Sequence, residues 1–280
     1  MPLPQASLKT IVARALREDL GRGDITSEAC VDPERPGEAS LRARERLVFC
    51  GSQLLIEVYR QIDPSLEISP RCRDGRMLQP GDTAAMVLGS ALSILAGERV
   101  ALNFIQRMSG IATLTRAYVD ELPQKSATRI VDTRKTTPGL RLLERYAVRC
   151  GGGRNHREDL SAAVLIKDNH IVACGGIRQA VQRARAAAPH TSRISCEVDT
   201  LQQLDEALDA GADVVMLDNF DDLRLRDAVK RAAGRALIEV SGGVTLERVA
   251  AIARLGVDVI SVGALTHSAR AVDLGLDLVV

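Results

Sequence analysis

Short apolar runs recur at a nearly constant interval in the second half of this chain. Four of them end 21 to 23 residues apart, at Glu197, Asp218, Ser241 and Val262. Helical stretches fill the intervals, and two earlier apolar runs lie at 130–131 and 163–166. Short buried strands that alternate with helices are typical of repeated βα units. A parallel sheet with helical connections is therefore predicted from residue 126 onward.

Each apolar run ends in polar or small residues. A parallel α/β barrel presents functional groups at the carboxyl ends of its strands in this way. A doubly wound open sheet does so too, but only near its switch point. Because every run is followed by such residues, the pattern favours a barrel, and because only six strands are readable we expect the barrel to be incomplete.

The first half of the chain has a different pattern of apolar and polar residues. An amphipathic pattern predicts a helix over 8–20, and the short alternating segments of 38–90, separated by turn residues, predict a small antiparallel sheet. A helix is expected within that region at 52–62, and a long one follows at 93–121. The apolar tail, 271–280, is compatible with a final strand or with the end of a helix.

Bulk properties narrow the class of protein. A formal net charge of +1 argues against a dedicated nucleic-acid or membrane-surface protein. No apolar stretch is long enough to span a bilayer, and the first residues lack a signal-peptide pattern, so a cytoplasmic location is the default expectation. None of the six cysteines forms a CxxC pair or has zinc-finger spacing, which predicts reduced, unligated thiols.

A basic cluster between residues 134 and 167 is the strongest functional signal. Its cations are Arg134, Lys135, Arg149, Arg154, His156, Arg157 and Lys167. They are interleaved with glycines and hydroxyl residues, unlike a solvated surface run. The chain has only five lysines among 37 Lys and Arg, and two of the five fall here, which indicates sites where arginine does not serve. The cluster predicts a site for a polyanionic small molecule.

Several residues at strand ends allow two interpretations. Glu197 and Asp218 are equally suited to Mg²⁺ carried in by a diphosphate and to ion pairs with the cluster. The turns Ser241-Gly242-Gly243 and Gly263-Ala264 are suited to phosphate binding, or are simply tight βα turns; two at adjacent strand ends favour phosphate. Lys167 is suited to a Schiff base, although the crowding cations favour anion binding.

Specific motifs then point to a family. Asp132-Thr-Arg-Lys-Thr-Thr-Pro-Gly139, Gly151-Gly-Gly-Arg-Asn-His-Arg157 and Leu165-Ile-Lys-Asp-Asn-His170 resemble those of the quinolinate phosphoribosyltransferases. Shorter matches are Glu18 to Thr26, Leu217-Asp-Asn219, Ser241-Gly-Gly243 and Ser261 to Ser268. The resemblance covers essentially the whole chain, in order.

The resemblance implies an α/β fold with two domains. An N-terminal α/β sandwich would comprise 1–112 completed by 270–280, and an incomplete, seven-stranded-type α/β barrel would comprise 113–269. It also implies a homodimer with shared active sites, with a hexamer as a further assembly. Neither a nucleic acid nor a membrane is expected as a partner.

The implied enzyme transfers the phosphoribosyl group of phosphoribosyl pyrophosphate to quinolinate with decarboxylation, giving nicotinate mononucleotide, pyrophosphate and CO₂ in de novo NAD synthesis. Mg²⁺ is the implied cofactor. By position, the quinolinate-binding residues are Arg134, His156 and Arg157, with Arg99 contributed by a partner subunit. Lys135 and Lys167 correspond to pocket lysines between the two substrates, and Glu197 and Asp218 to the pair near ribose and Mg²⁺-pyrophosphate. The phosphate-binding turns correspond to Ser241, Gly242, Gly243, Gly263 and Ala264.

Two departures from the family pattern stand out. Glu158-Asp159 replace a hydrophobic residue and a glycine, and Ser195 replaces the first glutamate of a Glu-Val-Glu-Val pattern. The carboxylates at 158 and 159 would either weaken the hold of Arg157 on a dicarboxylate or merely orient it. Three alternatives remain: a related phosphoribosyltransferase with another heterocycle such as nicotinate, a paralogue encoded with molybdate transporters, and a non-catalytic metabolite-binding protein.

Overall fold

The computed structural model describes residues 3–279, which form two compact units. The first unit contains the chain up to Arg116, the segment Thr136–Gly152 and the chain from Leu265 onward. The second contains Ala117–Lys135 and Gly153–Ala264. The expected domain boundaries near 112 and 270 remain a prediction. The two units are described separately below.

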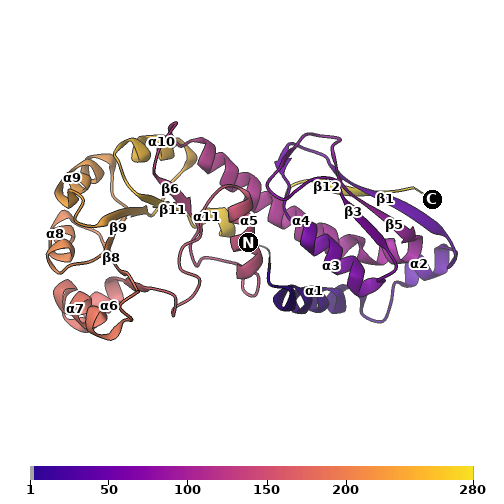
Figure 1. Ribbon diagram of the computed structural model, residues 1–280, viewed down its shortest axis with the longest axis horizontal. Helices are drawn as coiled ribbons and strands as arrows, with labels where there is room; N and C mark the ends of the chain where they lie inside the picture. The colour runs from indigo at the N-terminus through magenta and orange to yellow at the C-terminus, as the bar shows by residue number, and fades with distance from the viewer. Residues whose placement is uncertain (1–2, 280) are drawn as a thin grey trace. The chain divides into compact units, whose positions relative to one another are not determined.

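The first unit is built on an antiparallel sheet in the order β12-β1-β5-β3 (Figure 1). Its strands are β1 (Pro36–Ala43), β3 (Glu67–Pro70), β5 (Thr83–Ser90) and β12 (Leu274–Val279). A short separate pair is formed by β2 (Leu47–Val48) and β4 (Met77–Leu78). β12 pairs with β1, with Leu276 opposite Leu41, so the C-terminal tail is a strand that completes the N-terminal sheet.

Helices cover one side of this sheet (Figure 1). α3 (Ser52–Ile62) and α4 (Ala91–Asp120) lie along it, and the other helices of the first unit are α1 (Gln5–Leu20), α2 (Ile25–Cys30) and α5 (Arg141–Cys150). Two glycines in α4 permit close packing: a Cβ on Gly97 would lie 2.5 Å from the Tyr59 ring, and one on Gly110 would lie 1.9 Å from the carbonyl oxygen of Arg270. Glycine inside a helix lowers its stability, so these positions are explained by packing rather than by helix propensity.

The second unit is a curved parallel sheet in the order β6-β11-β10-β9-β8-β7. Its strands are β6 (Arg129–Val131), β7 (Val164–Ile166), β8 (Ile194–Val198), β9 (Val214–Asp218), β10 (Leu237–Ser241) and β11 (Val259–Ser261). The connecting helices are α6 (Asp168–Cys174), α7 (Ile177–Ala187), α8 (Leu201–Asp209), α9 (Asp222–Ala232), α10 (Leu246–Arg254) and α11 (Ala264–His267). α7 to α10 lie along the outer side of the sheet (Figure 1).

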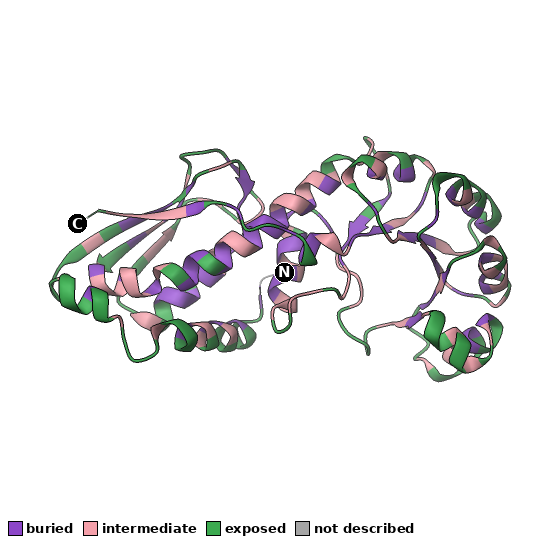
Figure 2. Ribbon diagram, turned by 180° about the vertical axis from the view of Figure 1, so that it is seen from behind, coloured by how far each residue is buried: buried purple, intermediate pink, exposed green. Residues whose placement is uncertain are grey.

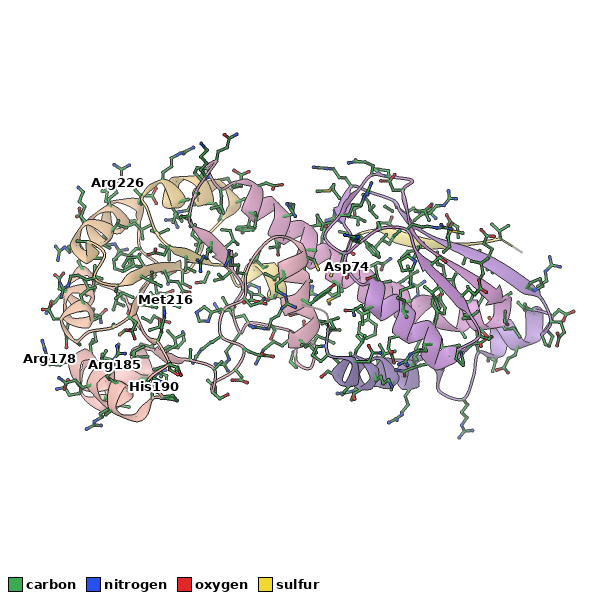
Figure 3. All side chains as sticks on the ribbon, viewed as in Figure 1. Asp74, Arg178, Arg185, His190, Met216 and Arg226 are labelled. Atoms are coloured by element: carbon green, nitrogen blue, oxygen red, sulfur yellow. The ribbon has the colours of Figure 1, made fainter. Side chains whose placement is uncertain are left out.

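Each strand alternates between two environments. Cys196, Val215 and Val240 face the helices and are buried at 2 % exposure or less. Their neighbours Glu197, Met216 and Glu239 are in register across the sheet and point to the inner side. Figure 2 shows the strands buried and the outer helix faces exposed, and Figure 3 shows Met216 at the sheet and Arg178 on the outer helices.

The parallel sheet does not close. β6 and β7 are its two edges, and a single parallel bridge, Val131 with Arg154, is all that continues it beyond β6 within the described chain. The structure therefore confirms the α/β class, the antiparallel N-terminal sheet and the incomplete parallel barrel. Between residues 3 and 279, no helix is both long and apolar enough to cross a membrane.

Candidate functional site

The carboxyl ends of all six parallel strands carry predicted site residues, and His156 and Arg157 lie in the loop before β7. Arg134 and Lys135 follow β6, and Lys167 follows β7. Glu197 lies near the end of β8. Asp218 ends β9, Ser241 ends β10, and Gly263-Ala264 follow β11. Parallel strands end at the same edge of a sheet, so these groups gather there. This arrangement was expected from the polar and small residues that follow each apolar run in the sequence.

Lys167 and Glu197 form an ion pair at this edge, with Nζ 2.5 Å from Oε2. Lys167 precedes α6, and its backbone N–H donates to Nδ1 of His170 at 3.0 Å. The lysine side chain is 45 % exposed, whereas the glutamate is 15 % exposed. An ion pair this accessible contributes little to stability, so both groups remain available to a ligand.

Glu197 and Asp218 lie on the same face of adjacent strands. Glu197 is in register with Met216, and Asp218 is two residues further along β9. Asn219 donates from Nδ2 to Asp218 Oδ2 at 2.8 Å, and its own backbone has φ of +55°. The two carboxylates therefore offer hard oxygen donors on one side of the sheet, the type that Mg²⁺ prefers.

The turn after β10 needs glycine for a steric reason. Gly242 has φ of +82°, and a Cβ there would lie 2.3 Å from Oδ1 of Asn219. Asn219 also donates its backbone N–H to the carbonyl oxygen of Ser241 at 3.1 Å. Gly243 is also in the left-handed region, with φ of +57°, but open space surrounds its Cα. The tight-turn interpretation thus accounts for Gly242, while phosphate binding by the two turns remains a prediction.

A fully buried aspartate organises the segment that contains His156. Asp132 accepts the Asn155 side-chain amide at Oδ2 and the backbone N–H of His156 at Oδ1, both at 2.6 Å. Asp132 follows β6 directly, and its backbone N–H donates to the carbonyl oxygen of Arg154. These bonds hold the loop of the basic cluster against the end of β6.

The His156 ring is engaged on both sides. Its Nδ1 accepts the backbone N–H of Arg157 at 2.7 Å, and its Nε2 lies 3.4 Å from Oε1 of Glu239. Glu239 is 4 % exposed and belongs to β10, two residues before Ser241. Sequence motifs alone do not single out Glu239, although a charged residue in an apolar strand is a detectable signal.

Two guanidinium groups meet at this site. Partial burial, and secondly the charge of Arg134, lower the pKa of Arg157. Nη1 of Arg157 also donates to the carbonyl oxygen of Ala163 at 3.0 Å. Arginine stays charged at neutral pH in spite of such a shift, so both groups remain cations that attract an anion.

The acidic pair that departs from the family pattern lies just beyond Arg157. Oδ1 of Asp159 accepts the backbone N–H and hydroxyl of Ser161 and the N–H of Ala162, at 2.7 to 3.1 Å. These bonds form an Asx turn, which gives Asp159 a local structural role. Glu158 and Asp159 are both exposed.

Comparisons with known proteins agree with this geometry. Family models described as the N-terminal and C-terminal domains of quinolinate phosphoribosyl transferase match residues 24–109 and 111–277. The probable nicotinate-nucleotide pyrophosphorylase [carboxylating] of Bacillus subtilis is 44 % identical over 271 residues, covering 97 % of this chain and 93 % of that protein. The nicotinate-nucleotide pyrophosphorylase [carboxylating] of Mycobacterium leprae is 44 % identical over 273 residues, covering 95 % of each. The chain belongs to the quinolinate phosphoribosyltransferase family.

The fold comparison leads to the same family. The crystal structure of NadC from Streptococcus pyogenes superposes with a TM-score of 0.95 at 39 % identity, covering 100 % of this chain and 99 % of that one. The match extends over both units of this quinolinate phosphoribosyltransferase family member. The sequence resemblance is therefore confirmed at the level of family and fold.

Arg99 is the one predicted site residue that belongs to the first unit. It lies on α4 and is exposed. The predicted role of Arg99 requires a partner subunit, and it remains a prediction for this family member.

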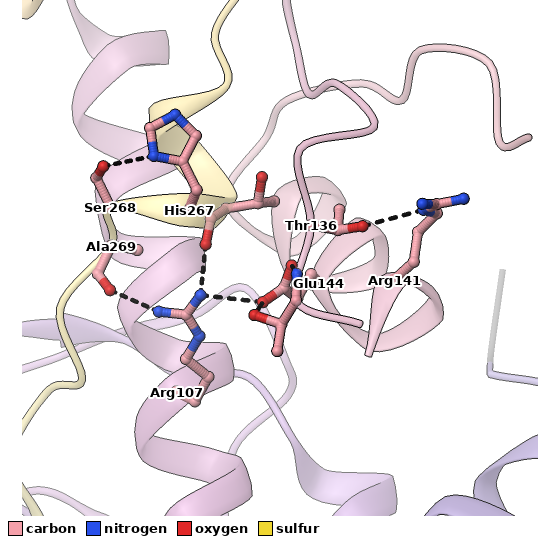
Figure 4. A network of polar contacts seen from close by, with 9 residues as sticks. Arg107, Thr136, Arg141, Glu144, His267, Ser268 and Ala269 are labelled. Atoms are coloured by element: carbon pink, nitrogen blue, oxygen red, sulfur yellow. Dashed lines mark hydrogen bonds and ion pairs between the residues drawn. The ribbon is translucent and has the colours of Figure 1, made fainter. Parts of the chain in front are cut away.

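A buried network in the first unit went unpredicted (Figure 4). Glu144 on α5 is fully buried and accepts Nη2 of Arg107 at 3.0 Å and the hydroxyl of Thr137 at 2.7 Å. Arg107 also donates to the carbonyl oxygens of Thr266 and Ala269. The available signal was a glutamate inside the buried stripe of α5. The network anchors the segment that directly follows Lys135.

Cysteines take no part in the candidate site. All six are free thiols. Within residues 3–279 one group of potential metal ligands occurs, Cys50, Asp74 and Cys150, with donor atoms within 4.8 Å of one another. Both oxygens of Asp74 already accept hydrogen bonds, from the Ser52 N–H at 3.0 Å and the Tyr146 hydroxyl at 2.7 Å. Asp74 thus has a sufficient structural role in the first unit.

Proposed function

We propose that this protein transfers the phosphoribosyl group of phosphoribosyl pyrophosphate to quinolinate, releasing pyrophosphate and CO₂ and forming nicotinate mononucleotide. This is the reaction implied by the motifs and by the names of the relatives, which include a quinolinate phosphoribosyltransferase [decarboxylating] of Nicotiana tabacum that is 39 % identical. It would place the enzyme in NAD biosynthesis, with the cytoplasm as its expected location.

The observation that carries the proposal is the gathering of charged groups at the carboxyl ends of the parallel strands, where Lys167 pairs with Glu197 and the charge of Arg134 contributes to lowering the pKa of Arg157. Arg134 and Arg157 are both cations, and an anion bound near them is attracted by both charges. Quinolinate carries two adjacent carboxylates, and arginine binds carboxylates through paired N–H groups. Arg134 and Arg157, with His156 beside them, would thus hold the ring in one orientation.

The ring nitrogen of quinolinate would then attack C1 of the ribose while the bond to pyrophosphate breaks. The transition state resembles an oxocarbenium ion, with positive charge on the sugar and growing negative charge on the leaving group. Lys135 and Lys167 would stabilise the departing pyrophosphate. Glu197 and Asp218 would lie on the ribose side, and the turns at Ser241 to Gly243 and at Gly263-Ala264 would receive the 5′-phosphate. Holding both substrates in place converts a bimolecular encounter into an oriented reaction.

Decarboxylation needs no additional acid from the chain. Once the ring nitrogen carries the ribose it is a pyridinium, which stabilises the carbanion left on the neighbouring carbon as CO₂ departs. That carbon then takes a proton from water. The residues at the site act by orienting the carboxylates until this step.

Mg²⁺ is the cofactor that the donor set fits. Glu197 and Asp218 are hard oxygen ligands on one face of adjacent strands, and each keeps lone pairs beyond its contact with Lys167 or Asn219. Bound Mg²⁺ supplies charge neutralisation on the pyrophosphate. The carboxylates would keep it on the ribose side of the lysines.

We further propose a homodimer in which Arg99 completes the site of the partner subunit, with a hexamer as a higher assembly. Mixing inactive Arg99→Ala with inactive Arg134→Ala subunits tests this. If sites are shared, re-associated heterodimers contain one intact site and regain activity. Mixtures that stay inactive after confirmed subunit exchange would contradict a shared site.

The activity is tested with purified protein, Mg²⁺ and phosphoribosyl pyrophosphate, measuring pyrophosphate release and CO₂ from quinolinate labelled at its 2-carboxylate. We expect equal amounts of both products with quinolinate and neither with nicotinate. Turnover of nicotinate would keep the transferase but replace the substrate. No turnover with either compound would favour a different heterocycle or a non-catalytic binding protein. Lys167→Ala, with the exposed Lys230→Ala as control, should lower kcat/KM by about 10²-fold or more.

A further inference from the structure

Glu239 is a buried carboxylate that the proposed catalytic steps do not use. Its side chain is 5 % exposed in the middle of β10, on the inner side of the parallel sheet. Oε1 is buried and receives no hydrogen bond from the described part of the chain. Leaving a carboxylate oxygen buried in this state is costly, and such groups are usually retained for a functional reason.

His156 is the group that Oε1 faces, with Nε2 at 3.4 Å. The other ring nitrogen, Nδ1, accepts the backbone N–H of Arg157 at 2.7 Å. An accepting nitrogen carries no proton, so the neutral imidazole must hold its proton on Nε2, directed at Glu239. The hydrogen-bond pattern thus selects one tautomer and one ring orientation. At 3.4 Å the contact is longer than a formed hydrogen bond, as is common at sites without ligand.

A chain of contacts runs from β10 to the guanidinium site. Glu239 faces the His156 ring, the ring holds the backbone of Arg157, and the Arg157 guanidinium lies beside that of Arg134. On the other side, Asp132 holds the backbone of His156 at 2.6 Å. Asp132 thus fixes the backbone of His156, while the Arg157 N–H and the Glu239 carboxylate face the two nitrogens of its ring.

We propose that Glu239 is a positioning residue for substrate binding: its carboxylate on the Nε2 side, together with the Arg157 N–H at Nδ1, holds the His156 ring in one tautomer and orientation, and the ring in turn places Arg157. The inference rests on the proposed function, in which Arg157 binds a carboxylate of the substrate. It assigns to Glu239 an effect on quinolinate binding and none on phosphoribosyl pyrophosphate. Carboxylates that orient a metal-ligating histidine typically change metal affinity by about 10- to 100-fold when removed, and we expect an effect of that order on quinolinate binding.

Two substitutions separate this role from a merely structural one. Glu239→Gln keeps the shape and an oxygen acceptor for Nε2–H, whereas Glu239→Leu keeps the volume and removes the acceptor. We expect KM for quinolinate to rise by about 10-fold or more in Glu239→Leu and by less than about 3-fold in Glu239→Gln, with KM for phosphoribosyl pyrophosphate unchanged. Ser195→Ala is the matched control, because Ser195 Oγ is also buried without a hydrogen-bond partner among the described residues. It should leave both constants unchanged.

The histidine itself provides a readout independent of turnover. The chain has only four histidines, so ¹⁵N spectra of the imidazoles can be assigned with single substitutions. His156 should show a protonated Nε2 and an unprotonated Nδ1 in the wild type and in Glu239→Gln, and a mixture of tautomers in Glu239→Leu. If the wild-type protein fails to turn over quinolinate, the proposed function fails, but this spectrum still decides whether Glu239 controls the ring.

A double-mutant cycle gives the final criterion. If Glu239 acts through His156, Glu239→Leu has no further effect on KM in a His156→Ala background. Additive effects would overturn the proposal, and so would an unchanged His156 tautomer in Glu239→Leu. If Glu239→Leu does not fold, as judged by circular dichroism, a Glu239→Gln protein that has lost the Nε2-protonated tautomer would equally overturn it.

Discussion

Two buried glutamates, one in each unit, differ in how completely their oxygens are satisfied. Glu144 in the first unit accepts hydrogen bonds from Arg107 and from the backbone and hydroxyl of Thr137, at 2.7 to 3.0 Å. Oε1 of Glu239 in the second unit receives none from the described residues and only faces His156. Burial alone therefore does not distinguish the two, but the number of donors does.

The cations of the two units differ in the same way. Arg107 donates to Glu144 and to the carbonyl oxygens of Thr266 and Ala269. Arg157 instead lies beside another cation, Arg134, which helps to lower its pKa. The saturated network serves the fold. In the second unit the charge of Arg134 lowers the pKa of Arg157, and groups with perturbed pKa values are candidates for a binding site.

The sharpest test of this contrast removes a charge from the second unit. Arg134→Gln should lower kcat/KM for quinolinate by about 10²- to 10³-fold, because a carboxylate loses its charged, forked donor. The free energy of unfolding should stay within about 1 kcal/mol of the wild type, since one of two repelling charges is gone. Steady-state kinetics and urea unfolding measure the two quantities.

The matched control for that test is Arg178→Gln, an exposed arginine on the outer helices (Figure 3). It should change neither activity nor stability. A large loss of stability in Arg134→Gln would mean that Arg134 supports the fold. Arg134 would then act like Arg107, and the cations of the two units would not differ in role.

The converse change is made in the first unit. Glu144→Ala leaves the Arg107 guanidinium and the Thr137 N–H without their buried acceptor, so we expect the free energy of unfolding to fall by about 3 to 5 kcal/mol. Glu67→Ala, at an exposed strand position, should change it by less than about 0.5 kcal/mol. Urea unfolding monitored by circular dichroism compares them. Similar stability for the two variants would show that saturation of Glu144 is not what holds the network together.

Much of the fold was predictable because its signals are local. The last four apolar runs end 21 to 23 residues apart, and apolar runs locate the six parallel strands to within two residues. The residues of the C-terminal tail did not decide between a strand and a helix end. The tail becomes a strand by pairing with β1, which lies more than 200 residues earlier in the chain. The family resemblance supplied that pairing.

The candidate site was predictable only in part, because some of its contacts join residues that lie far apart in the sequence. Arg134, Lys167 and Glu197 stand in motifs whose spacing is visible in the chain. Asp132, Glu144 and Glu239 act on partners that are remote in sequence, such as Glu144 on Arg107, 37 residues away. No local pattern shows whether a buried carboxylate will find three donors or none, because that depends on tertiary packing.

A third carboxylate can separate two effects on stability: the number of hydrogen-bond donors that a carboxylate has, and how deeply it is buried. Glu45 in the first unit is well partnered but lies near the surface: it binds Arg270 and accepts the backbone N–H of Asp273 at 2.8 Å, close to the start of β12. The hydrogen bond from Arg270 is the main cause that lowers the pKa of Glu45 from 4.5 to about 2.

The pH dependence of unfolding follows from that shift. Because the carboxyl regains its ordinary pKa when the chain unfolds, its contribution to stability is complete above about pH 4.5 and is lost as the pH falls toward 2. Solvent screening keeps this contribution at about 1 kcal/mol or less. Glu45→Gln should therefore be slightly less stable than the wild type at pH 7 and equally stable near pH 2, whereas Glu67→Gln should follow the wild-type curve throughout. Urea unfolding across this pH range measures the difference in the free energy of unfolding. If this difference between the wild type and Glu45→Gln does not change with pH, a carboxylate with several hydrogen-bond donors stabilises this fold only when it is also buried.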